Sequence, residues 1–175
     1  MPTDRPHPLV LQLRFSRAEF LRGVKGVTDA DGAIRLGPMN CLAWNVGHLA
    51  WQEQRYFLTF AQGLVPNPDV QETYKVGAPG VTPRLSETLA AWRDITGNAD
   101  PWLDRLTTDL LLEHPMRNGK PMAVQYGNLL QRTIYHYWYH CGENQAIRQQ
   151  LGHAKLGQFV GNIDDEAPYT PERDR

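Results

Sequence analysis

Apolar residues recur at helical spacing along most of the chain. Positions three and four residues apart share one face of a helix, so such a pattern predicts amphipathic α-helices. The apolar stripe of the first helix consists of Leu9, Leu13, Ala18, Phe20, Leu21 and Val24. This helix is expected over residues 9–25, and a second one over residues 41–61, with Asn40 as its N-cap and Gly63 at its end.

The second half of the chain predicts three further helices. An apolar stripe follows Pro83, a residue that suits the first turn of a helix. A short helix is expected over residues 101–109, and the longest helix over about residues 122–151. Before the longest helix, a brief extended segment is expected to break at Asn118-Gly119.

Three segments lack a helical pattern. Breaker residues in 26–39 predict a loop, and residues 63–81 are rich in glycine and proline and predict no regular structure. We expect residues 63–81 to help form the wall of a pocket. The charged, proline-bearing tail 154–175 is expected to be mobile or weakly docked. Long amphipathic helices with little strand signal predict an all-α fold, a four-helix bundle with a long loop and a short extra helix.

The size and composition of the chain fit one globular domain, residues 1–175, with 41% apolar and 21% charged residues. The net charge of -1 argues against a general electrostatic grip on nucleic acid. No apolar stretch approaches the roughly 20 residues that span a bilayer. The N-terminus lacks the apolar region of a signal peptide, and Cys41 and Cys141 suit a reduced compartment. We therefore expect a cytoplasmic protein without disulfides.

The stretch YHYWYHCGE in the longest predicted helix holds His136 and His140 four residues apart. A track of residues spaced by three and four places both on an inward face, between Leu129 and Ile147. At this spacing the two rings lie one above the other, as in zinc sites where one helix supplies two ligands. The pair is therefore either part of a metal site or part of a local hydrogen-bond network.

A metal site needs a further ligand, and His48 is the candidate because it lies on an inward face in the middle of a predicted helix. His7, His114 and His153 lie in loops or at helix ends. Three neutral imidazoles from two helices could hold a metal and leave positions open for water or substrate. Such ligands suit Zn, Ni, Fe, Co or Cu. The alternative is that these are core histidines held by hydrogen bonds.

Glu143 follows His140 by three residues on the same track. It could orient the ligand or act as a base on metal-bound water, or it could simply pair with an arginine or lysine. Cys141 points about 100° away from His140, so we interpret it as a small buried apolar group. Tyr137 and Trp138 also point away from the histidine face, which predicts their burial by other helices or by a partner subunit.

Two segments, MNCLAWNVGHLAWQEQRYF and LLQRTIYHYWYHCGENQAIRQQLGH, resemble the signatures of the DinB/YfiT-like superfamily. The resemblance covers about residues 9–153, which is the expected core of the domain. It implies a four-helix bundle, often a homodimer, with one divalent metal ion. Zn or Ni is the favoured ion, with Fe, Co, Mn and Cu as alternatives. The metal ligands that the resemblance implies are His48, His136 and His140.

Relatives implied by this resemblance include thiol-dependent transferases and isomerases, some using mycothiol or bacillithiol, and a domain of ergothioneine biosynthesis. Many others are known only as stress-inducible or damage-inducible proteins. Our first hypothesis is a metal-dependent enzyme, a thiol-dependent S-transferase or a related transferase or isomerase. It would act on a small-molecule substrate with a low-molecular-weight thiol as co-substrate.

Two alternatives stay open. One is a metal-dependent hydrolase that uses metal-bound water, with Glu143 as the catalytic base. The other is a non-catalytic, stress-associated, dimeric metal-binding protein. In each case we expect a homodimer, and neither nucleic acid nor a membrane as a partner.

Overall fold

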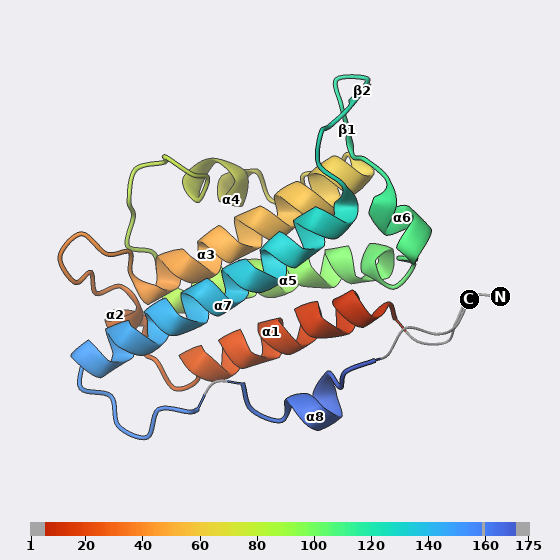
Figure 1. Ribbon diagram of the computed structural model, residues 1–175. Coiled ribbons are helices and arrows are strands. Elements are labelled where there is room, and N and C mark those ends of the chain that lie inside the picture. Colours follow the sequence, from red (N-terminus) through yellow and green to blue (C-terminus); the bar gives the residue numbers. More distant parts are fainter. Residues whose placement is uncertain (1–5, 159, 171–175) are drawn as a thin grey trace.

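The computed structural model describes residues 6–158 and 160–170, and four long helices form its body (Figure 1). The long helices are α1 (Pro8–Val24), α3 (Leu42–Glu53) with its π-helical extension η1 (Gln54–Phe60), α5 (Leu85–Leu103) and α7 (Tyr126–Gln150). This arrangement confirms the predicted all-α fold. In the described part of the chain, no helix combines the length and the apolar character that crossing a membrane requires.

Short elements lie between the long helices and, in the case of α8, after the last of them. They are α2 (Asp29–Gly32), α4 (Pro68–Thr73), α6 (Thr108–Leu112), β1 (Met116–Arg117), β2 (Lys120–Pro121) and α8 (Ile163–Glu166). The two strands pair antiparallel, and Asn118 and Gly119 turn between them with φ angles of 51° and 75°. Asparagine and glycine tolerate this left-handed backbone, so the break expected at Asn118-Gly119 is the turn of a small hairpin.

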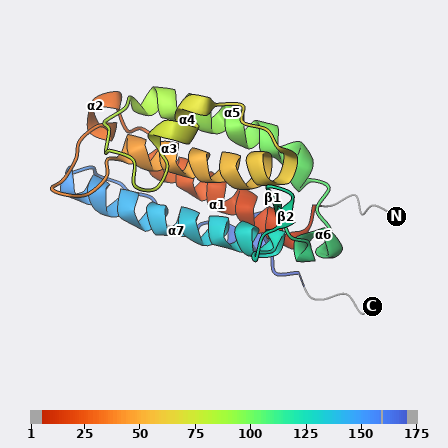
Figure 2. The ribbon, with the colours of Figure 1, turned by 90° about the horizontal axis from the view of Figure 1, so that it is seen from above.

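Helix α3 packs against both α5 and α7, and α1 packs against α7 (Figure 1 and Figure 2). Apolar side chains from all four long helices fill the space between them. Those with almost no exposed surface include Leu13, Phe20, Leu49, Phe57, Ile95 and Leu130. Because α3 and α7 are neighbours in this packing, side chains on their facing sides can meet.

A polar network crosses this core and joins the four long helices. Arg17 of α1 donates from Nε to Glu53 Oε1 of α3 at 2.8 Å, and from Nη2 to the other carboxylate oxygen. Tyr137 of α7 donates its hydroxyl to Glu53 Oε1 at 2.6 Å, and Trp92 of α5 donates Nε1 to that hydroxyl at 2.6 Å. Arg17 Nη1 also donates to Asp100 Oδ1 of α5 at 2.8 Å. Each contact in the network therefore links two different helices.

Glu53 is fully buried, so its carboxylate depends on these partners. A charge that leaves water without a partner costs several kcal/mol. Burial alone would lower the pKa of Arg17, but the ion pair with Glu53 raises it overall. Burial raises the pKa of Tyr137 well above the ordinary value of tyrosine. Arg17 is thus a cation and Tyr137 a neutral hydroxyl at neutral pH, which is the state that this network needs.

The second helix begins one residue later than predicted. Cys41, and not Asn40, is its N-cap residue, and the Cys41 side chain makes no capping bond. The side-chain oxygen of Asn40 is used elsewhere, since it accepts a hydrogen bond from Arg35 Nη2 at 3.3 Å. At its far end the α-helix becomes a π-helix after Glu53, and helical structure stops before Gly63, as predicted.

The two helices predicted on either side of Asp100 form one helix, α5, which runs through Pro101. A proline inside a helix removes one backbone hydrogen bond. Here the neighbours of Pro101 are anchored, because Asp100 accepts a hydrogen bond from α1 and Trp102 stacks on Phe57 with ring centroids 5.9 Å apart. These tertiary contacts offset the lost bond, so the prediction of a separate helix starting at Pro101 was wrong.

The last helix begins at Tyr126 and not near Met122. The backbone N–H of Met122 donates to Pro115 O at 2.8 Å, and that of Tyr126 donates to Glu113 O at 3.0 Å. These two bonds tie the end of the hairpin back to the end of α6. The residues between them are therefore held outside the helix, although their side chains fit a helical pattern.

Two segments that were expected to lack helices contain short ones, α2 in residues 26–39 and α4 in residues 63–81. Each begins with a capping side chain. Thr28 and Asn67 each accept a hydrogen bond from the backbone N–H three residues later, at 3.1 and 3.0 Å. Such caps stabilise helices that are too short for apolar periodicity to reveal them.

The described part of the C-terminal tail docks on α1. Gln12 Nε2 donates to Ala167 O at 2.9 Å, and the backbone N–H of Gly161 donates to Glu19 Oε2 at 3.0 Å. Ala167, which follows the short helix α8, is almost fully buried. The tail expected to be mobile or weakly docked therefore has defined contacts, and residues 171–175 lie outside the described part.

We expect Tyr137→Phe to lower the free energy of unfolding by about 1–3 kcal/mol, because Glu53 and Trp92 both lose a buried hydrogen-bond partner. Urea unfolding of the metal-free wild type and variant at one pH measures the difference. Tyr135→Phe is the matched control, since that side chain is 68% exposed. Equal losses of stability in the two variants would contradict the structural role of the Tyr137 hydroxyl.

Candidate metal centre

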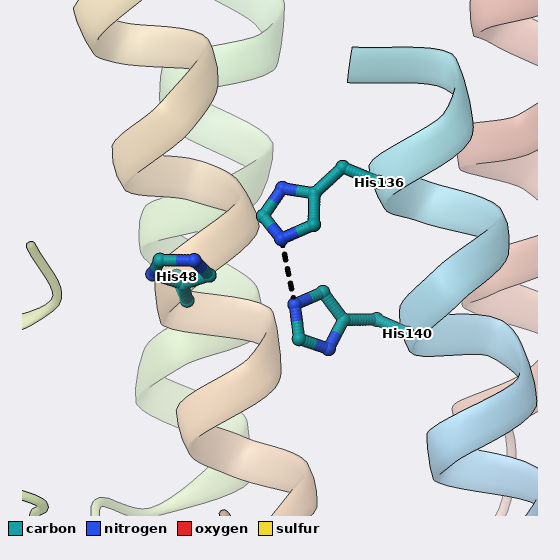
Figure 3. Close-up of side chains that lie close together, drawn as sticks. All are labelled: His48, His136 and His140. Carbon is teal, nitrogen blue, oxygen red and sulfur yellow. Dashed lines mark hydrogen bonds between the residues drawn. The ribbon is translucent and has the colours of Figure 1, made fainter. Parts of the chain in front are cut away.

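Three histidines meet between α3 and α7. Figure 3 shows His136 and His140 reaching from α7 toward the side of α3 that carries His48. One ring nitrogen from each of the three lies within 4.8 Å of the other two. His48 and His140 are buried and His136 is half-buried. The structure thus brings together the three residues on which the helical tracks of the sequence converge.

Each imidazole binds an acceptor through Nδ1. The acceptors are a backbone carbonyl, a side-chain amide oxygen and a carboxylate oxygen, so each Nδ1 carries the proton. The three bonds are His48 to Tyr74 O at 2.7 Å, His136 to Gln52 Oε1 at 2.9 Å and His140 to Glu143 Oε2 at 2.7 Å. With its proton at Nδ1, a neutral imidazole has its lone pair at Nε2, which is the form in which histidine binds metals.

The Nε2 atoms of His136 and His140 face each other at 2.9 Å (Figure 3). With Nδ1 protonated in both rings, a hydrogen bond between them would need a second proton on one ring. Burial, with smaller contributions from His140 and His48, lowers the pKa of His136 to about 3. Burial also lowers the pKa of His48. Facing lone pairs repel unless a cation is shared between them, so this donor set fits a divalent metal ion.

His48 is held between two indole rings of its own helix. Its ring centroid lies 4.6 Å from that of Trp44 and 5.2 Å from that of Trp51, with interplanar angles of 15° and 19°. All three side chains are buried. The stack fixes the plane of the imidazole, and His136 meets it edge-on, with the two ring centroids 5.0 Å apart. Only the edge of His48 is therefore presented to the histidines of α7.

Gly47 allows Tyr74 to pack directly on α3. A Cβ atom at position 47 would lie 2.5 Å from Tyr74 Cε1, which is closer than real contacts allow. The carbonyl of Tyr74 is the acceptor of His48 Nδ1, so this close approach brings the segment after α4 to the metal centre. The segment belongs to residues 63–81, which the sequence leaves without regular structure.

Sequence reasoning missed three contributors to the site. Gln52 holds His136, and its spacing of four residues from His48 places it on the same face of α3, which is the signal that could have found it. Asn45 donates Nδ2 to Glu143 Oε2 at 3.0 Å. Tyr74 contributes a backbone carbonyl, which no pattern of side chains can reveal.

Glu143 lies on the far side of the His140 ring from the other histidines. Its Oε2 atom accepts from His140 Nδ1 and from Asn45, whereas His140 Nε2 faces His136. A carboxylate in this place fixes the orientation of a metal-binding imidazole and increases its basicity. The contact favours the orienting role, and the catalytic role expected for Glu143 stays a prediction.

Neither cysteine is part of the cluster. Cys141 is buried, and burial raises the pKa of its thiol to about 12, so the thiol stays protonated at neutral pH and is a poor nucleophile. Cys41 is buried at the start of α3, where its Sγ lies 3.8 Å from Val81 O. Both side chains act as small buried groups.

The other histidines make contacts elsewhere. Their hydrogen bonds are Leu9 N to His7 Nδ1 at 3.2 Å, His114 Nδ1 to Met122 O at 2.8 Å and Arg148 Nε to His153 Nδ1 at 3.1 Å. Among residues 6–158 and 160–170, the one group of three or more side chains placed to hold a metal is His48, His136 and His140.

Tyr137 and Trp138 point away from the histidine face, and the helices of the same chain cover them. Tyr137 is fully buried in the core. Trp138 is half-buried against Phe15 of α1, with ring centroids 6.0 Å apart. Of the two ways of burial that the sequence left open, the structure shows burial by other helices.

We expect the natively purified protein to hold up to one divalent metal ion per chain, and His136→Ala to lose it, because one of three imidazole ligands is removed. Elemental analysis and titration of the chelator-treated protein with Zn²⁺ measure this. His114→Ala is the control, since that exposed imidazole lies outside the cluster. Equal metal content in wild type and His136→Ala would contradict a metal centre here.

Comparison with curated proteins finds no match. Comparison with family models finds one that is described as the DinB superfamily, and it matches residues 12–143. The match covers more than half of the chain and includes α3 and all three histidines of the cluster. The protein therefore belongs to the DinB superfamily.

Proposed function

We propose that this protein is a metal-dependent enzyme of the thiol-dependent transferase type. The observation that carries the proposal is the set of three imidazoles, each held by an acceptor at Nδ1, with one ring nitrogen of each within 4.8 Å of the other two. Structural zinc sites close the coordination with four protein ligands, whereas catalytic sites keep a position open. Three imidazoles therefore support a catalytic centre, in line with the metal binding expected of a DinB-like protein.

A small molecule supplies the nucleophile in this proposal. Cys141 is buried with a raised thiol pKa, and Cys41 is buried beside Val81, so neither protein thiol serves. A divalent cation held by the three imidazoles would lower the pKa of a thiol that binds beside it and stabilise the thiolate. Zn or Ni is the favoured ion, with Fe, Co, Mn and Cu as alternatives.

The proposed reaction joins the sulfur of the thiol to an electrophilic carbon of a second small molecule. The S–H proton passes to solvent, and a sulfur lone pair forms the S–C bond. The leaving group departs with the electron pair that bound it to the carbon. The protein contributes by holding the imidazoles in place through Tyr74 O, Gln52 and Glu143. An isomerase would instead add the thiolate reversibly to one carbon of a double bond, with no leaving group, and later expel it, which regenerates the thiol.

Two alternatives differ from this proposal in what they require. A hydrolase would turn over an ester or amide without a thiol, and it would need Glu143 as a base near the reacting water. The Glu143 carboxylate instead lies at Nδ1 of His140, which does not support that role. A non-catalytic, stress-associated metal-binding dimer would hold the metal and show no turnover with any thiol. The homodimer itself and the cytoplasmic location stay predictions.

We expect Glu143→Gln to lower the affinity for metal about 10-fold to 100-fold, because an amide oxygen can still accept from His140 but the negative charge is lost. Competition with a chelator measures the affinity, and kcat at saturating metal should change little. A large fall in kcat with unchanged metal affinity would instead assign Glu143 as the base.

We expect the metal-loaded protein to couple 2-mercaptoethanol to an aryl chloride such as 1-chloro-2,4-dinitrobenzene, and to lose this activity with chelator or with His140→Ala. Absorbance of the thioether product measures the rate. Cys141→Ser is the control and should keep the rate, since that thiol is buried and protonated. Ester hydrolysis that continues without thiol, together with no coupling, would replace this proposal with the hydrolase.

A further inference from the structure

We propose that a cavity beside the metal centre binds the carboxylate group of a small-molecule substrate. The cavity has a volume of about 340 Å³, and its lining residues come from the end of α3 with η1, from α4 and the segment after it, and from strand β1. This volume suits a small organic molecule. The inference rests on the proposed function for the reaction that follows binding, whereas the binding of a carboxylate can be tested by itself.

A stack of side chains connects the cavity to the metal centre. Trp51 lines the cavity and also stacks on His48, with ring centroids 5.2 Å apart. On the same helix face, Arg55 places Cζ 5.3 Å from the ring centroid of Trp51. A single indole therefore contacts both the candidate metal ligand and the cationic group of the cavity. Only the side chain of Trp51 therefore separates a molecule in this part of the cavity from His48 of the proposed reaction centre.

The lining of the cavity carries three positive charges and no carboxylate. The cations are Arg55 of η1, Lys75 after α4 and Arg117 of β1. Lys75 pairs with Glu72 at 2.5 Å, but this pair is exposed and such pairs contribute little. In the described part of the chain, Arg55 and Arg117 have no acidic partner. Three cations from three separate segments thus surround one space, which favours an anionic occupant.

Aromatic rings and not carboxylates hold Arg55. Its Cζ lies 5.3 Å from the ring of Trp51, 6.0 Å from that of Tyr56 and 5.2 Å from that of Phe60. Cation–π contacts of this kind position a guanidinium without using its N–H donors. Those donors suit the two oxygens of a carboxylate, which arginine binds with a pair of parallel hydrogen bonds.

Two polar atoms on residues of the cavity wall are buried without a hydrogen-bond partner in the described part of the chain. They are Nε1 of Trp51, whose side chain is 5% exposed, and Oε1 of Gln71. Leaving a buried donor unpaired is unfavourable. Neither atom is open to water in the free protein, so a ligand reaches them only if the side chains that cover them move. The expected ligand is a carboxylate borne by the thiol or by its electrophilic partner.

Succinate, a carboxylate without a thiol, tests the binding. We expect it to shift the indole N–H resonance of Trp51 in the full-length protein, both with Zn²⁺ bound and after chelator treatment, while neutral 1,4-butanediol does not. We expect Arg55→Gln and Arg117→Gln each to raise the Kd of succinate about tenfold. Arg117 lies on the exposed hairpin, so its variant keeps the test valid even if Arg55→Gln fails to fold.

Arg132→Gln is the matched control, because this exposed arginine of α7 does not line the cavity, and its Kd should stay within about twofold of the wild type. An equal loss of succinate affinity in Arg132→Gln would show that only the overall charge of the protein matters, and it would contradict a specific carboxylate site. A response that vanishes with the metal and ignores Arg55→Gln would assign succinate to the metal centre. Tighter binding of inorganic phosphate than of succinate would overturn the carboxylate assignment.

A comparison of two thiols tests the link to the reaction. Mercaptosuccinate carries carboxylates and thioglycerol is neutral, and we expect Arg55→Gln to raise the KM of mercaptosuccinate alone, with kcat unchanged. Equal KM effects on both thiols would contradict carboxylate recognition. If no thiol is turned over while succinate still binds through Arg55, the proposed function fails and the carboxylate site stands.

Discussion

The fully buried carboxylate of Glu53 is the constraint on which the geometry of the metal centre depends. The hydroxyl of Tyr137 on α7 lies 2.6 Å from Glu53 Oε1 on α3. One residue earlier on each helix, His136 Nδ1 lies 2.9 Å from Gln52 Oε1. Adjacent residues on a helix point about 100° apart. The two bonds therefore lie on different sides of the α3–α7 contact, one in the core and one at the histidine cluster, and together they fix the register of the two helices.

Such a network contributes more to geometry than to stability. Burying a charge is costly, and an apolar replacement of the whole network could be as stable. What the network provides is a single alignment, because any slide of α7 along α3 would separate Glu53 from Tyr137 and leave its charge without one of its partners. The cluster needs this precision, since its ligand atoms lie within 4.8 Å of one another and come from both helices.

Much of this arrangement could be predicted from helical periodicity, since residues spaced by three and four along the sequence assign His48, His136 and His140 to inward helix faces. Periodicity fails where a tertiary contact overrides local preference, as it does for α5 at Pro101, where anchored neighbours offset a lost bond. It also fails for Tyr74, whose carbonyl holds His48, because a backbone group has no sequence signature. Helical periodicity likewise does not predict that α3 continues as a π-helix after Glu53.

Gln54, the first residue of the π-helix, connects the end of α3 to the segment whose carbonyl orients His48. Up to Glu53 the α-helical register is fixed by the bonds to α7, and η1 begins at the next residue, Gln54. The Gln54 side chain forms two hydrogen bonds with the backbone of Asn67, at 2.8 and 2.9 Å, which anchors the start of α4. Helix α4 then delivers Tyr74 to Gly47 and His48, one residue after it ends. The chain thus leaves the end of α3 through η1 and α4 and returns to the middle of α3 at Tyr74. The orientation of His48 therefore depends on the anchoring bonds of η1. Arg55, another residue of η1, lines the cavity.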